Sequence, residues 1–289
     1  MRIRKAVLPV AGLGTRVLPA SKVIPKEMLP LVDKPTLQYI VEEAVEAGIE
    51  EIIFVTSRSK RSIEDHFDIF PEMEQALERK GKHKELEALR HVQNMATYTS
   101  VRQPVALGLG HAILCAKALV GNEPFVVMLG DELVAPETPC LKRMMEIYEK
   151  YNGSVLSLFT SPREMISSYG IASVNNVEED VVQVTHLVEK PPIDEAPSDQ
   201  GVAGRYILTP DIFELLEKTP PGRGGEIQVT DAIQVQAQAE RCYGLRFSGI
   251  RYDTGNPLGL LTTSIAYGLK RPDIAPGLRE YMRQALREE

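Results

Sequence analysis

The first half of the chain alternates short apolar runs with segments of helical period. Residues 5–10, 51–56 and 125–129 are continuous apolar runs, which predict buried strands. Between the first two, apolar residues recur three and four positions apart from Leu37 to Val45, which predicts an amphipathic helix ending at Gly48. This alternation of strands and helices is typical of a mostly parallel sheet.

The pattern continues with less regularity. We expect strands at 100–103 and 154–160, with helices at 109–119 and 141–148. Residues 68–95 interrupt it with a stretch rich in Lys and Glu, predicted as exposed helices broken at Gly81. A solvated excursion is the main interpretation of that stretch, and an oligomer contact or a flap over a nucleotide are the alternatives. From residue 169 the strands become shorter, and helical material follows residue 256.

Length and composition limit the classes of protein. A chain of 289 residues is long for one α/β domain and could also form two. The net charge of −7 argues against a general nucleic-acid-binding protein. No apolar run approaches the about 18 residues of a membrane span, and the chain does not open with a signal peptide. We therefore expect a cytoplasmic protein with no membrane partner.

The first apolar run leads into a candidate nucleotide site. It ends in a glycine-rich turn at residues 11–15, followed by Arg16 and, ten residues later, Lys26. Glycines allow backbone N–H groups to approach an anion closely, and the two cations add charge, so the segment is suited to a polyphosphate. Val17 stands where a dinucleotide fingerprint needs its third glycine, which disfavours an NAD-dependent oxidoreductase. No Gly-Lys-Ser/Thr closes the turn, so it is not a Walker loop.

The stretch GLGTRVLPASKVIPKEMLPLVDKP at residues 12–35 resembles the sugar-1-phosphate nucleotidylyltransferases. Within that family it is most similar to the bacterial UTP–glucose-1-phosphate uridylyltransferases, and the likeness extends through DTGN at 253–256 to about residue 270. The resemblance implies a Rossmann-like, mixed but mostly parallel, doubly wound sheet of the nucleotidyltransferase type A. A small β-rich sugar-binding region and a helical C-terminus complete the expected α/β fold.

The resemblance also implies an organisation and a reaction. We expect a single nucleotidyltransferase domain over residues 1–289. Its nucleotide-binding half spans about 1–135, its sugar-binding half about 136–256, and C-terminal helices follow from about 257. The implied reaction transfers a uridylyl group from UTP to α-D-glucose 1-phosphate and releases pyrophosphate. No nucleophile–base pair is evident in the sequence, which fits direct displacement without a covalent enzyme intermediate.

A second glycine-rich element, at residues 103–111, is predicted to lie between a strand and a helix N-terminus. In the resembled family this loop embraces the base and ribose. The implied nucleotide-binding residues are Ala11, Gly12, Gly14, Thr15, Glu27, Gln103 and Gly108. Arg16 and Lys26 are the implied catalytic cations on the triphosphate.

Asp131 follows the most apolar run of the chain. A carboxylate at the carboxyl end of a central strand is well placed to hold a hard divalent cation that bridges phosphates. The resemblance implies that Asp131 binds Mg²⁺, and that Asp253 either joins it on the metal or supports it indirectly. The triplet Gly-Asp-Glu at 130–132 differs from the Pro-Asp or Asp-Asp of the nearest relatives, so Glu132 receives no role.

The sugar site is implied by the resemblance alone. The backbone of Gly170 and the carboxylate of Glu189 would hold sugar hydroxyls, and Lys190 would bind the sugar phosphate as a third catalytic cation. Ala203 and Arg205 would line the same pocket. Thr230 or Gln228 is predicted to organise the start of a helix at 232–239.

Two other functions stay open at this point. A sugar-1-phosphate thymidylyltransferase using dTTP would share the chemistry, and a catalytically silent sugar-nucleotide sensor would share the fold. The complete set Arg16, Lys26, Asp131 and Lys190 disfavours the sensor, which has no need of a metal carboxylate. The expected partners are UTP and glucose 1-phosphate, with no nucleic acid, and a homo-oligomer (dimer or tetramer) follows from family precedent.

Overall fold

Strand β1 (Lys5–Pro9) is buried on both faces and occupies the middle of the first half of the sheet. In the computed structural model, which describes residues 2–135 and 137–287, it pairs in parallel with β4 (Glu51–Thr56) and β6 (Phe125–Met128). Strand β5 (Thr97–Arg102) extends the sheet beyond β4, also in parallel. Because β4 and β5 lie on one side of β1 and β6 on the other, the strand order reverses at β1, as in doubly wound folds.

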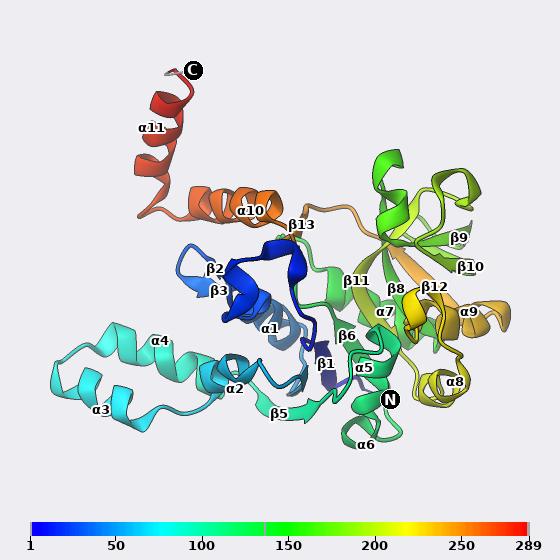
Figure 1. The fold of residues 1–289 in the computed structure, drawn as a ribbon, viewed down its shortest axis with the longest axis horizontal. Coiled ribbons are helices and arrows are strands. Elements are labelled where there is room, and N and C mark those ends of the chain that lie inside the picture. Colours follow the sequence, from blue (N-terminus) through cyan, green and yellow to red (C-terminus); the bar gives the residue numbers. More distant parts are fainter. Residues whose placement is uncertain (1, 136, 288–289) are drawn as a thin grey trace.

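These strands belong to a nine-stranded sheet with the order β5-β4-β1-β6-β11-β8-β12-β10-β9 (Figure 1). The remaining members are β8 (Ser154–Thr160), β9 (Gly170–Asn176), β10 (Val181–Glu189), β11 (Gln200–Leu208) and β12 (Cys242–Arg246). The pairings make β10 and β11 antiparallel to their neighbours, while the other strands share one direction. The predicted mixed, mostly parallel sheet is therefore confirmed.

Two small two-stranded sheets accompany the large one. Strand β7 (Glu132–Val134) pairs antiparallel with β13 (Arg251–Asp253), and β2 (Pro30–Leu31) pairs with β3 (Lys34–Pro35). The first of these pairs matters for the site, since it brings residue 253 opposite residue 132.

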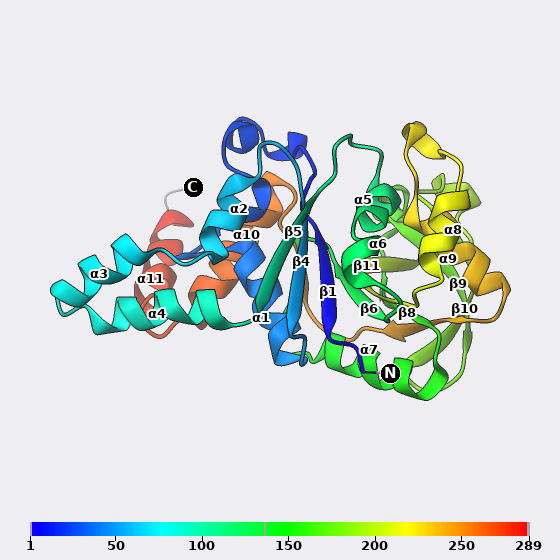
Figure 2. The ribbon, with the colours of Figure 1, turned by 90° about the horizontal axis from the view of Figure 1, so that it is seen from below.

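Helices cover both faces of the large sheet because its strands alternate apolar residues to both sides. Ala6 and Leu8 pack in one cluster with α1 (Thr36–Glu46) and α7 (Cys140–Tyr151). Val7 points to the opposite face, covered by α5 (Leu109–Cys115), α8 (Ile212–Lys218) and α9 (Val229–Gln238). Figure 2 shows the two layers of helices on either side of the sheet.

The hydrophilic stretch between β4 and β5 forms a projecting hairpin. After α2 (Arg61–Phe67), helices α3 (Pro71–Arg79) and α4 (His83–Asn94) run outward and back, away from the sheet (Figures 1 and 2). Arg90 on α4 pairs with Glu74 and Glu78 on α3. The predicted break at Gly81 lies between the two helices, where φ is +65°. The solvated excursion is the interpretation that this placement favours.

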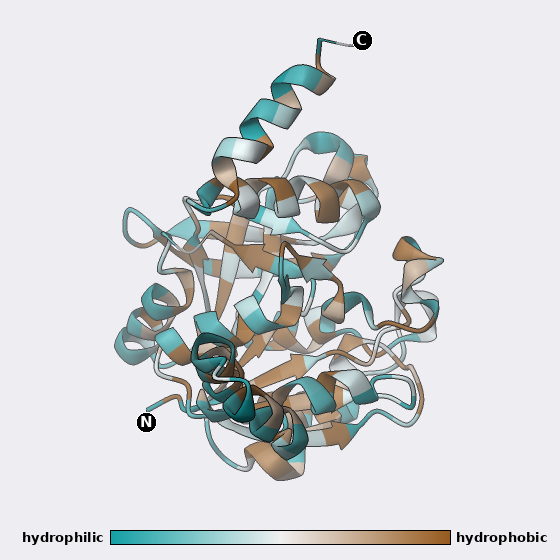
Figure 3. Cartoon of the chain, turned by 90° about the vertical axis from the view of Figure 1, so that its left-hand side faces the viewer, coloured by the Kyte–Doolittle hydropathy of each residue, from teal (hydrophilic) through white to brown (hydrophobic). Residues whose placement is uncertain are grey.

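The C-terminus forms two helices, α10 (Pro257–Lys270) and α11 (Ala275–Ala285). Helix α11 packs against α10 and extends away from the body of the protein, with mostly hydrophilic colours in Figure 3, whereas the strands are largely brown. The remaining helical segments are α6 (Lys117–Val120) and short 3-10 turns at Thr15–Val17, Ala20–Lys22, Lys26–Met28, Arg163–Ser168, Ile193–Glu195 and Arg223–Gly225. Within residues 2–135 and 137–287, no helix combines the length and apolar character needed to cross a membrane.

Several predicted boundaries differ from the structure; the helix expected at 232–239, for example, spans Val229–Gln238. The strand expected at 100–103 spans Thr97–Arg102, because its polar residues still pair with β4 at the edge of the sheet. The helix expected at 109–119 is divided into α5 and α6 at Ala116, whose N–H donates to Ile113 three residues back and so tightens the last turn.

Candidate active site

A cleft of about 1090 Å³ opens at the carboxyl ends of β1 and β6 and extends to β9 and β10. Ligands of open α/β sheets bind at this edge, where the strand order reverses. The cleft lining includes these predicted site residues: Thr15, Arg16, Lys26, Asp131, Gly170, Glu189, Lys190 and Asp253. The tertiary structure therefore brings together residues that are more than two hundred positions apart.

The glycine-rich turn after β1 depends on Gly14. Its φ of +68° lies in the left-handed region, and a Cβ atom there would lie 3.2 Å from Ser21 Cβ and 3.3 Å from Lys26 Cβ. Ser21 Oγ donates a hydrogen bond to the carbonyl of Gly14 at 2.7 Å. The turn is thereby packed against the segment that supplies Lys26. Gly12 is exposed, and nothing lies within 4 Å of the position its Cβ would take, which leaves backbone open to a ligand.

Both cations of the first loop converge on Asp131. Lys26 Nζ lies 2.5 Å and Arg16 Nη2 lies 3.3 Å from the same oxygen, Oδ2. Burial opposes ionisation of this carboxyl, but the charges of Lys26 and Arg16 outweigh burial and lower the pKa of Asp131 below its usual value. Asp131 is therefore ionised at neutral pH, and its carboxylate is the focus of charge in the cleft.

A second carboxylate faces the same space. Asp253 Oδ1 accepts a hydrogen bond from the N–H of Gly255 at 2.8 Å, and Thr254 donates through N and Oγ1 to the carbonyl of Asp131 at 2.9 and 3.0 Å. A Cβ on Gly255 would lie 2.6 Å from Asp131 Oδ2 and 3.0 Å from Asp253 Oδ1. The glycine thus leaves room beside both carboxylates.

This donor set fits a hard divalent cation. Carboxylate oxygens are the ligands that Mg²⁺ prefers, and one or two of them suffice when substrate phosphates supply others. Among the described residues, no group of three or more His, Cys, Asp or Glu side chains could hold a metal ion. Asp131 and Asp253 both line this cleft and are two carboxylates that could contribute ligands to such an ion.

Glu27 is buried beside the cleft and is paired with a residue that the sequence did not indicate. Its carboxylate lies 2.7 Å from Lys60 Nζ, and both side chains are at most 4% exposed. Burial raises the pKa of Glu27, although the charges of Lys60 and Lys26 act to lower it. Gly130 allows the close approach, since a Cβ there would lie 2.8 Å from Glu27 Cγ. Lys60 is a single lysine in a polar loop after β4, so no periodicity or motif distinguishes it.

The second glycine-rich loop also has its predicted form. Gln103 Nε2 donates to the carbonyl of Gly108 at 3.1 Å and lies 3.0 Å from His111 Nδ1. Gly108 has a φ of +93°, and a Cβ there would lie 2.6 Å from Glu226 Cβ. The loop therefore packs tightly against the segment before α9 while it opens α5.

The predicted sugar-side residues lie across the cleft from Asp131. Gly170 and Glu189 are paired in register between β9 and β10. Lys190 Nζ lies 3.2 Å from Glu189 Oε1, and Thr230 Oγ1 donates to Glu189 Oε2 at 2.6 Å. Thr230 thus orients Glu189 instead of capping α9, whose first residue is Val229, and the predicted capping role is wrong for it.

The structure places Arg205 and Ala203 away from the residues that line the cleft. Arg205 is fully buried, its Nη2 lies 2.7 Å from Glu43 Oε2, and it donates to the carbonyl of Glu132 at 2.8 Å. Along β11, Val202 and Tyr206 line the cleft, whereas residues 203 and 205 do not. Residues 203 and 205 are buried, and β11 is irregular at this point: its register with β8 shifts between Val202 and Tyr206, and Gly204 has a φ of +65°.

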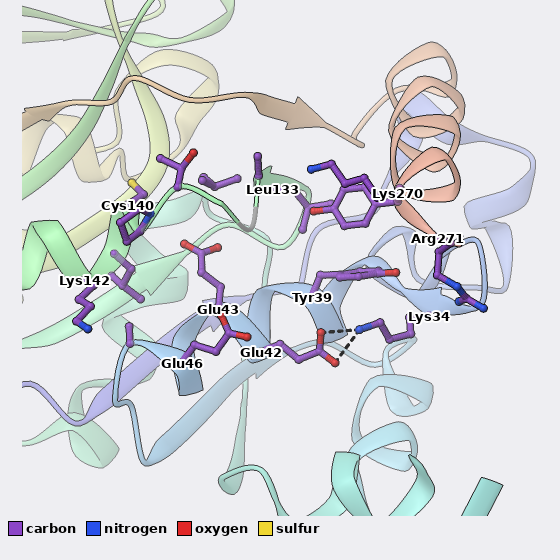
Figure 4. A pocket seen from close by; sticks show the side chains of 17 residues that line it. Lys34, Tyr39, Glu42, Glu43, Glu46, Leu133, Cys140, Lys142, Lys270 and Arg271 are labelled. Atoms are coloured by element: carbon purple, nitrogen blue, oxygen red, sulfur yellow. Dashed lines mark hydrogen bonds and ion pairs between the residues drawn. The ribbon is translucent and has the colours of Figure 1, made fainter. Parts of the chain in front are cut away.

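Glu43, the partner of Arg205, belongs to a separate cavity of about 590 Å³ between α1, the start of α7 and the end of α10. Figure 4 shows Glu42, Glu43 and Glu46 along one side of this cavity, with Tyr39 beside Lys34. None of the predicted site residues lines it. Arg205 therefore supports the sheet between this cavity and the cleft.

Arg251 is a second residue that the sequence analysis missed. It lies on β13, two positions before Asp253, and its guanidinium contacts both carboxylate oxygens of Glu132 at 2.8 and 2.6 Å. Burial raises the pKa of Glu132 to about 7, although the charge of Arg251 acts to lower it. A signal was available: residues two apart on a strand share a face, which places Arg251 on the side of Asp253.

The chain is similar to known proteins over nearly its whole length. The family model described as nucleotidyl transferase matches residues 5–268. The UTP–glucose-1-phosphate uridylyltransferase of Bacillus subtilis is 49% identical over 288 residues, covering 100% of this chain and 99% of the relative. A UTP-bound UGPase from Acinetobacter baumannii shares the fold with a TM-score of 0.90 and 43% identity, covering 97% of this chain and 99% of that one. A UDP-glucose pyrophosphorylase complexed with UDP-glucose has a TM-score of 0.85 and 46% identity, with 93% and 100% covered.

The residues of the cleft, the sheet order and these full-length similarities support one conclusion. The chain belongs to the nucleotidyl transferase family, and within it to the bacterial UTP–glucose-1-phosphate uridylyltransferases.

Proposed function

We propose that this chain transfers a uridylyl group from UTP to α-D-glucose 1-phosphate and releases UDP-glucose and pyrophosphate. The observation that carries the proposal is the convergence of Arg16 and Lys26 on Asp131, in a cleft whose other side holds Glu189 and Lys190. Such an arrangement suits two phosphate-bearing substrates that must meet. The activity named for the relatives agrees with it.

The nucleotide would bind at the two glycine-rich loops. Backbone N–H groups of Ala11, Gly12, Gly14 and Thr15 would approach the triphosphate and base, as the exposure of the first loop permits. Glu27, Gln103 and Gly108 would read the uracil edge. Arg16 and Lys26 would exchange Asp131 for phosphate oxygens and stabilise the negative charge that grows on pyrophosphate as it leaves.

Asp131 and Asp253 would hold Mg²⁺, whose chemistry is to bridge and neutralise phosphate oxygens. The carboxylate pair beside Gly255 and the lowered pKa of Asp131 support this assignment. Because Lys26 and Arg16 already lie on Asp131, the carboxylate is held ionised and oriented before any ligand binds.

Glucose 1-phosphate would bind opposite. Glu189, oriented by Thr230, would accept hydrogen bonds from sugar hydroxyls beside the backbone of Gly170. Lys190 would bind the sugar phosphate and reduce its repulsion from the triphosphate. A phosphate oxygen of the sugar then attacks the α-phosphorus in line, and the bond from the α-phosphorus to the bridging oxygen of pyrophosphate breaks.

Three further expectations belong to this proposal. The continuous nine-stranded sheet supports one domain that binds the nucleotide with its first half and the sugar with its second. The exposed apolar residues of α10 and α11, such as Leu258 and Tyr281, support a homo-oligomer. The use of a nucleoside triphosphate and a sugar phosphate agrees with the cytoplasmic location expected from the sequence.

The direct test is pyrophosphate release from glucose 1-phosphate and Mg²⁺ with UTP, dTTP, ATP, CTP and GTP in parallel. Release dominated by UTP is the expected result. Comparable or faster release with dTTP would move the chain to the thymidylyltransferases. A folded protein that is silent with every nucleotide would favour the sugar-nucleotide sensor and refute catalysis.

A further inference from the structure

The contacts of Arg251 extend beyond Glu132 to the sugar side of the cleft. Its Nη2 donates a hydrogen bond to Tyr169 Oη at 2.8 Å, while Nη1 contacts the two oxygens of Glu132. The guanidinium also stacks on two rings, at 4.1 Å from the centroid of Phe159 and 4.8 Å from that of Tyr169. One planar group therefore contacts β7, β8 and the residue that precedes β9.

This arrangement is buried and geometrically specific. The side chains of Arg251 and Glu132 are 16% and 10% exposed, so each charge depends on its partner. A guanidinium can lie flat on aromatic rings while its edge donates in fixed directions, whereas the lysine ammonium is a point charge on a flexible stem. Arginine is thus the residue that can make all of these contacts at once.

The groups that Arg251 joins belong to the two sides of the cleft. Glu132 follows Asp131 directly and lies opposite Asp253 in the β7–β13 pair. Tyr169 precedes Gly170, and its carbonyl accepts a hydrogen bond from the N–H of Lys190 at 3.0 Å. The guanidinium itself lies behind the cleft wall, since Glu132 and Tyr169 line the cleft and Arg251 does not.

We propose that Arg251 is a positioning residue that sets the separation between the Asp131–Asp253 carboxylates and the Gly170–Lys190 segment. The inference rests on the proposed function, because these segments would hold the nucleotide and the sugar phosphate respectively. In-line transfer requires the attacking oxygen near the α-phosphorus, and a misplacement of 1 Å costs about a hundredfold in rate. Arg251 acts on the reaction through Tyr169 and Glu132, without touching either substrate.

The test compares kcat and the two KM values of Arg251→Met, Arg251→Lys and Tyr169→Phe with those of the wild type. We expect Arg251→Met to lower kcat about a hundredfold and to raise KM for glucose 1-phosphate, with KM for UTP changed less than about twofold. Arg251→Lys retains the charge but not the planar contacts and is expected to stay impaired. Tyr169→Phe removes one hydroxyl and is expected to lower kcat about tenfold, since it deletes one hydrogen bond to a charged group.

Arg143→Met is the matched control. Arg143 likewise makes a two-point contact with a carboxylate, to Asp180 at 2.8 and 2.9 Å, and it is not among the residues that line the cleft. It should lose stability without a change in either KM. Thermal unfolding with and without UTP identifies a variant that has failed to fold. If Arg251→Met fails to fold, the kinetics of Tyr169→Phe still test the proposal.

The outcomes separate the two proposals. An inactive wild-type chain overturns the proposed function and the positioning role with it. An active wild type, with Arg251→Lys and Tyr169→Phe at wild-type kcat and KM, overturns the positioning role alone. A loss shared equally between KM for UTP and KM for glucose 1-phosphate also contradicts it, because a general structural role predicts that result.

Discussion

At the level of single residues, the cleft brings ionised side chains together, although burial by itself disfavours their charged forms. Asp131 keeps its ionised form because Lys26 and Arg16 lie on one of its oxygens, and Glu27 keeps a partner in Lys60. A charge removed from water destabilises the fold unless it is paired, so each of these contacts stabilises the protein in addition to setting the charge in the cleft.

Arg16→Ala and Asp131→Ala are each expected to lower turnover at least about a hundredfold while the protein stays folded, as the loss of charge-stabilising groups does elsewhere. Pyrophosphate release with UTP and glucose 1-phosphate measures this. Arg61→Ala is the matched control, because the side chain of Arg61 is 87% exposed and pairs with its helix neighbour Asp65. A near-wild-type rate in either cleft variant would refute the role assigned to that residue.

Lys60→Met leaves the carboxylate of Glu27 buried without its main partner. We expect a loss of about 3 kcal/mol in the free energy of unfolding, measured by urea denaturation, together with weaker UTP binding. The double variant Glu27→Gln with Lys60→Met removes both charges and should recover most of the stability but not the UTP affinity. If Lys60→Met is as stable as the wild type, the pair does not stabilise the fold.

At the scale of elements, loops are held by glycines whose surroundings differ. Gly108 has a φ of +93° and tight packing against Glu226 and Ile227, whereas Gly81 has a φ of +65° and open space around it. Substitution at Gly81 therefore tests the cost of the backbone conformation alone, whereas substitution at Gly108 adds the cost of close packing.

Gly108→Ala is expected to cost about 2 kcal/mol or more and to weaken UTP binding, because the conformation favours glycine and the added methyl group meets Ile227 O at 2.9 Å. Gly81→Ala, in the α3–α4 hairpin, should cost only about 1 kcal/mol and leave UTP affinity unchanged. Thermal unfolding and calorimetric UTP titration check both. Equal effects at the two positions would contradict a close-packed nucleotide loop.

An ion pair at the start of β1 gives a pH-dependent contribution. Hydrogen bonds from Arg4 and Lys5 lower the pKa of Glu123 from 4.5 to about 2, which ties β1 to the turn before β6. Since the folded pKa is depressed, the stabilisation is complete above the unfolded pKa and is lost as pH falls from about 5 towards 2.

Glu123→Gln is therefore expected to destabilise the protein by roughly 1 kcal/mol at pH 7, with a difference from wild type that shrinks steadily below pH 5. Urea denaturation at pH 7 and pH 3 measures both values. A difference that is the same at the two pH values would show that the charge of Glu123 is not the cause.

At the scale of the whole molecule, one continuous sheet bears both sides of the cleft. Strands β1 and β5 lead into the two glycine-rich loops, and β9, β10 and β11 contribute residues to the opposite wall. The C-terminal helices lie outside this arrangement, and α11 extends from the body with Tyr281 and Leu286 exposed.

Removal of residues 275–289 tests the role of α11 in assembly. No residue of α11 lines the cleft, so turnover per chain should be retained. We expect a dimer or tetramer for the full chain in light scattering and a smaller assembly for the truncated one. A full-length monomer contradicts the proposed oligomer, and an unchanged assembly shows that α11 does not form its interface.

Most helices and strands, and several of the candidate site residues, could be predicted from the amino-acid sequence. Strand β1, its glycine-rich turn and Asp131 after β6 follow from local causes, since apolar runs, turn residues and strand ends are written in short stretches of chain. The sheet class followed from the alternation of those elements, and the resemblance in residues 12–35 led to the family that the comparisons show.

The contacts between side chains far apart in the sequence depend on how the chain folds in three dimensions. Lys60 pairs with Glu27 across 33 positions, and Arg251 pairs with Glu132 across 119. The period of a strand could indicate the face on which Arg251 lies, but no pattern in the sequence identifies the partner of either residue. Arg205 lies away from the cleft and pairs with Glu43, because a resemblance locates a residue only along the chain, whereas the local path of β11 sets the side to which its side chain points. Ion pairs between remote segments depend on how the strands are ordered and paired, and that order is set by the packing of the whole chain.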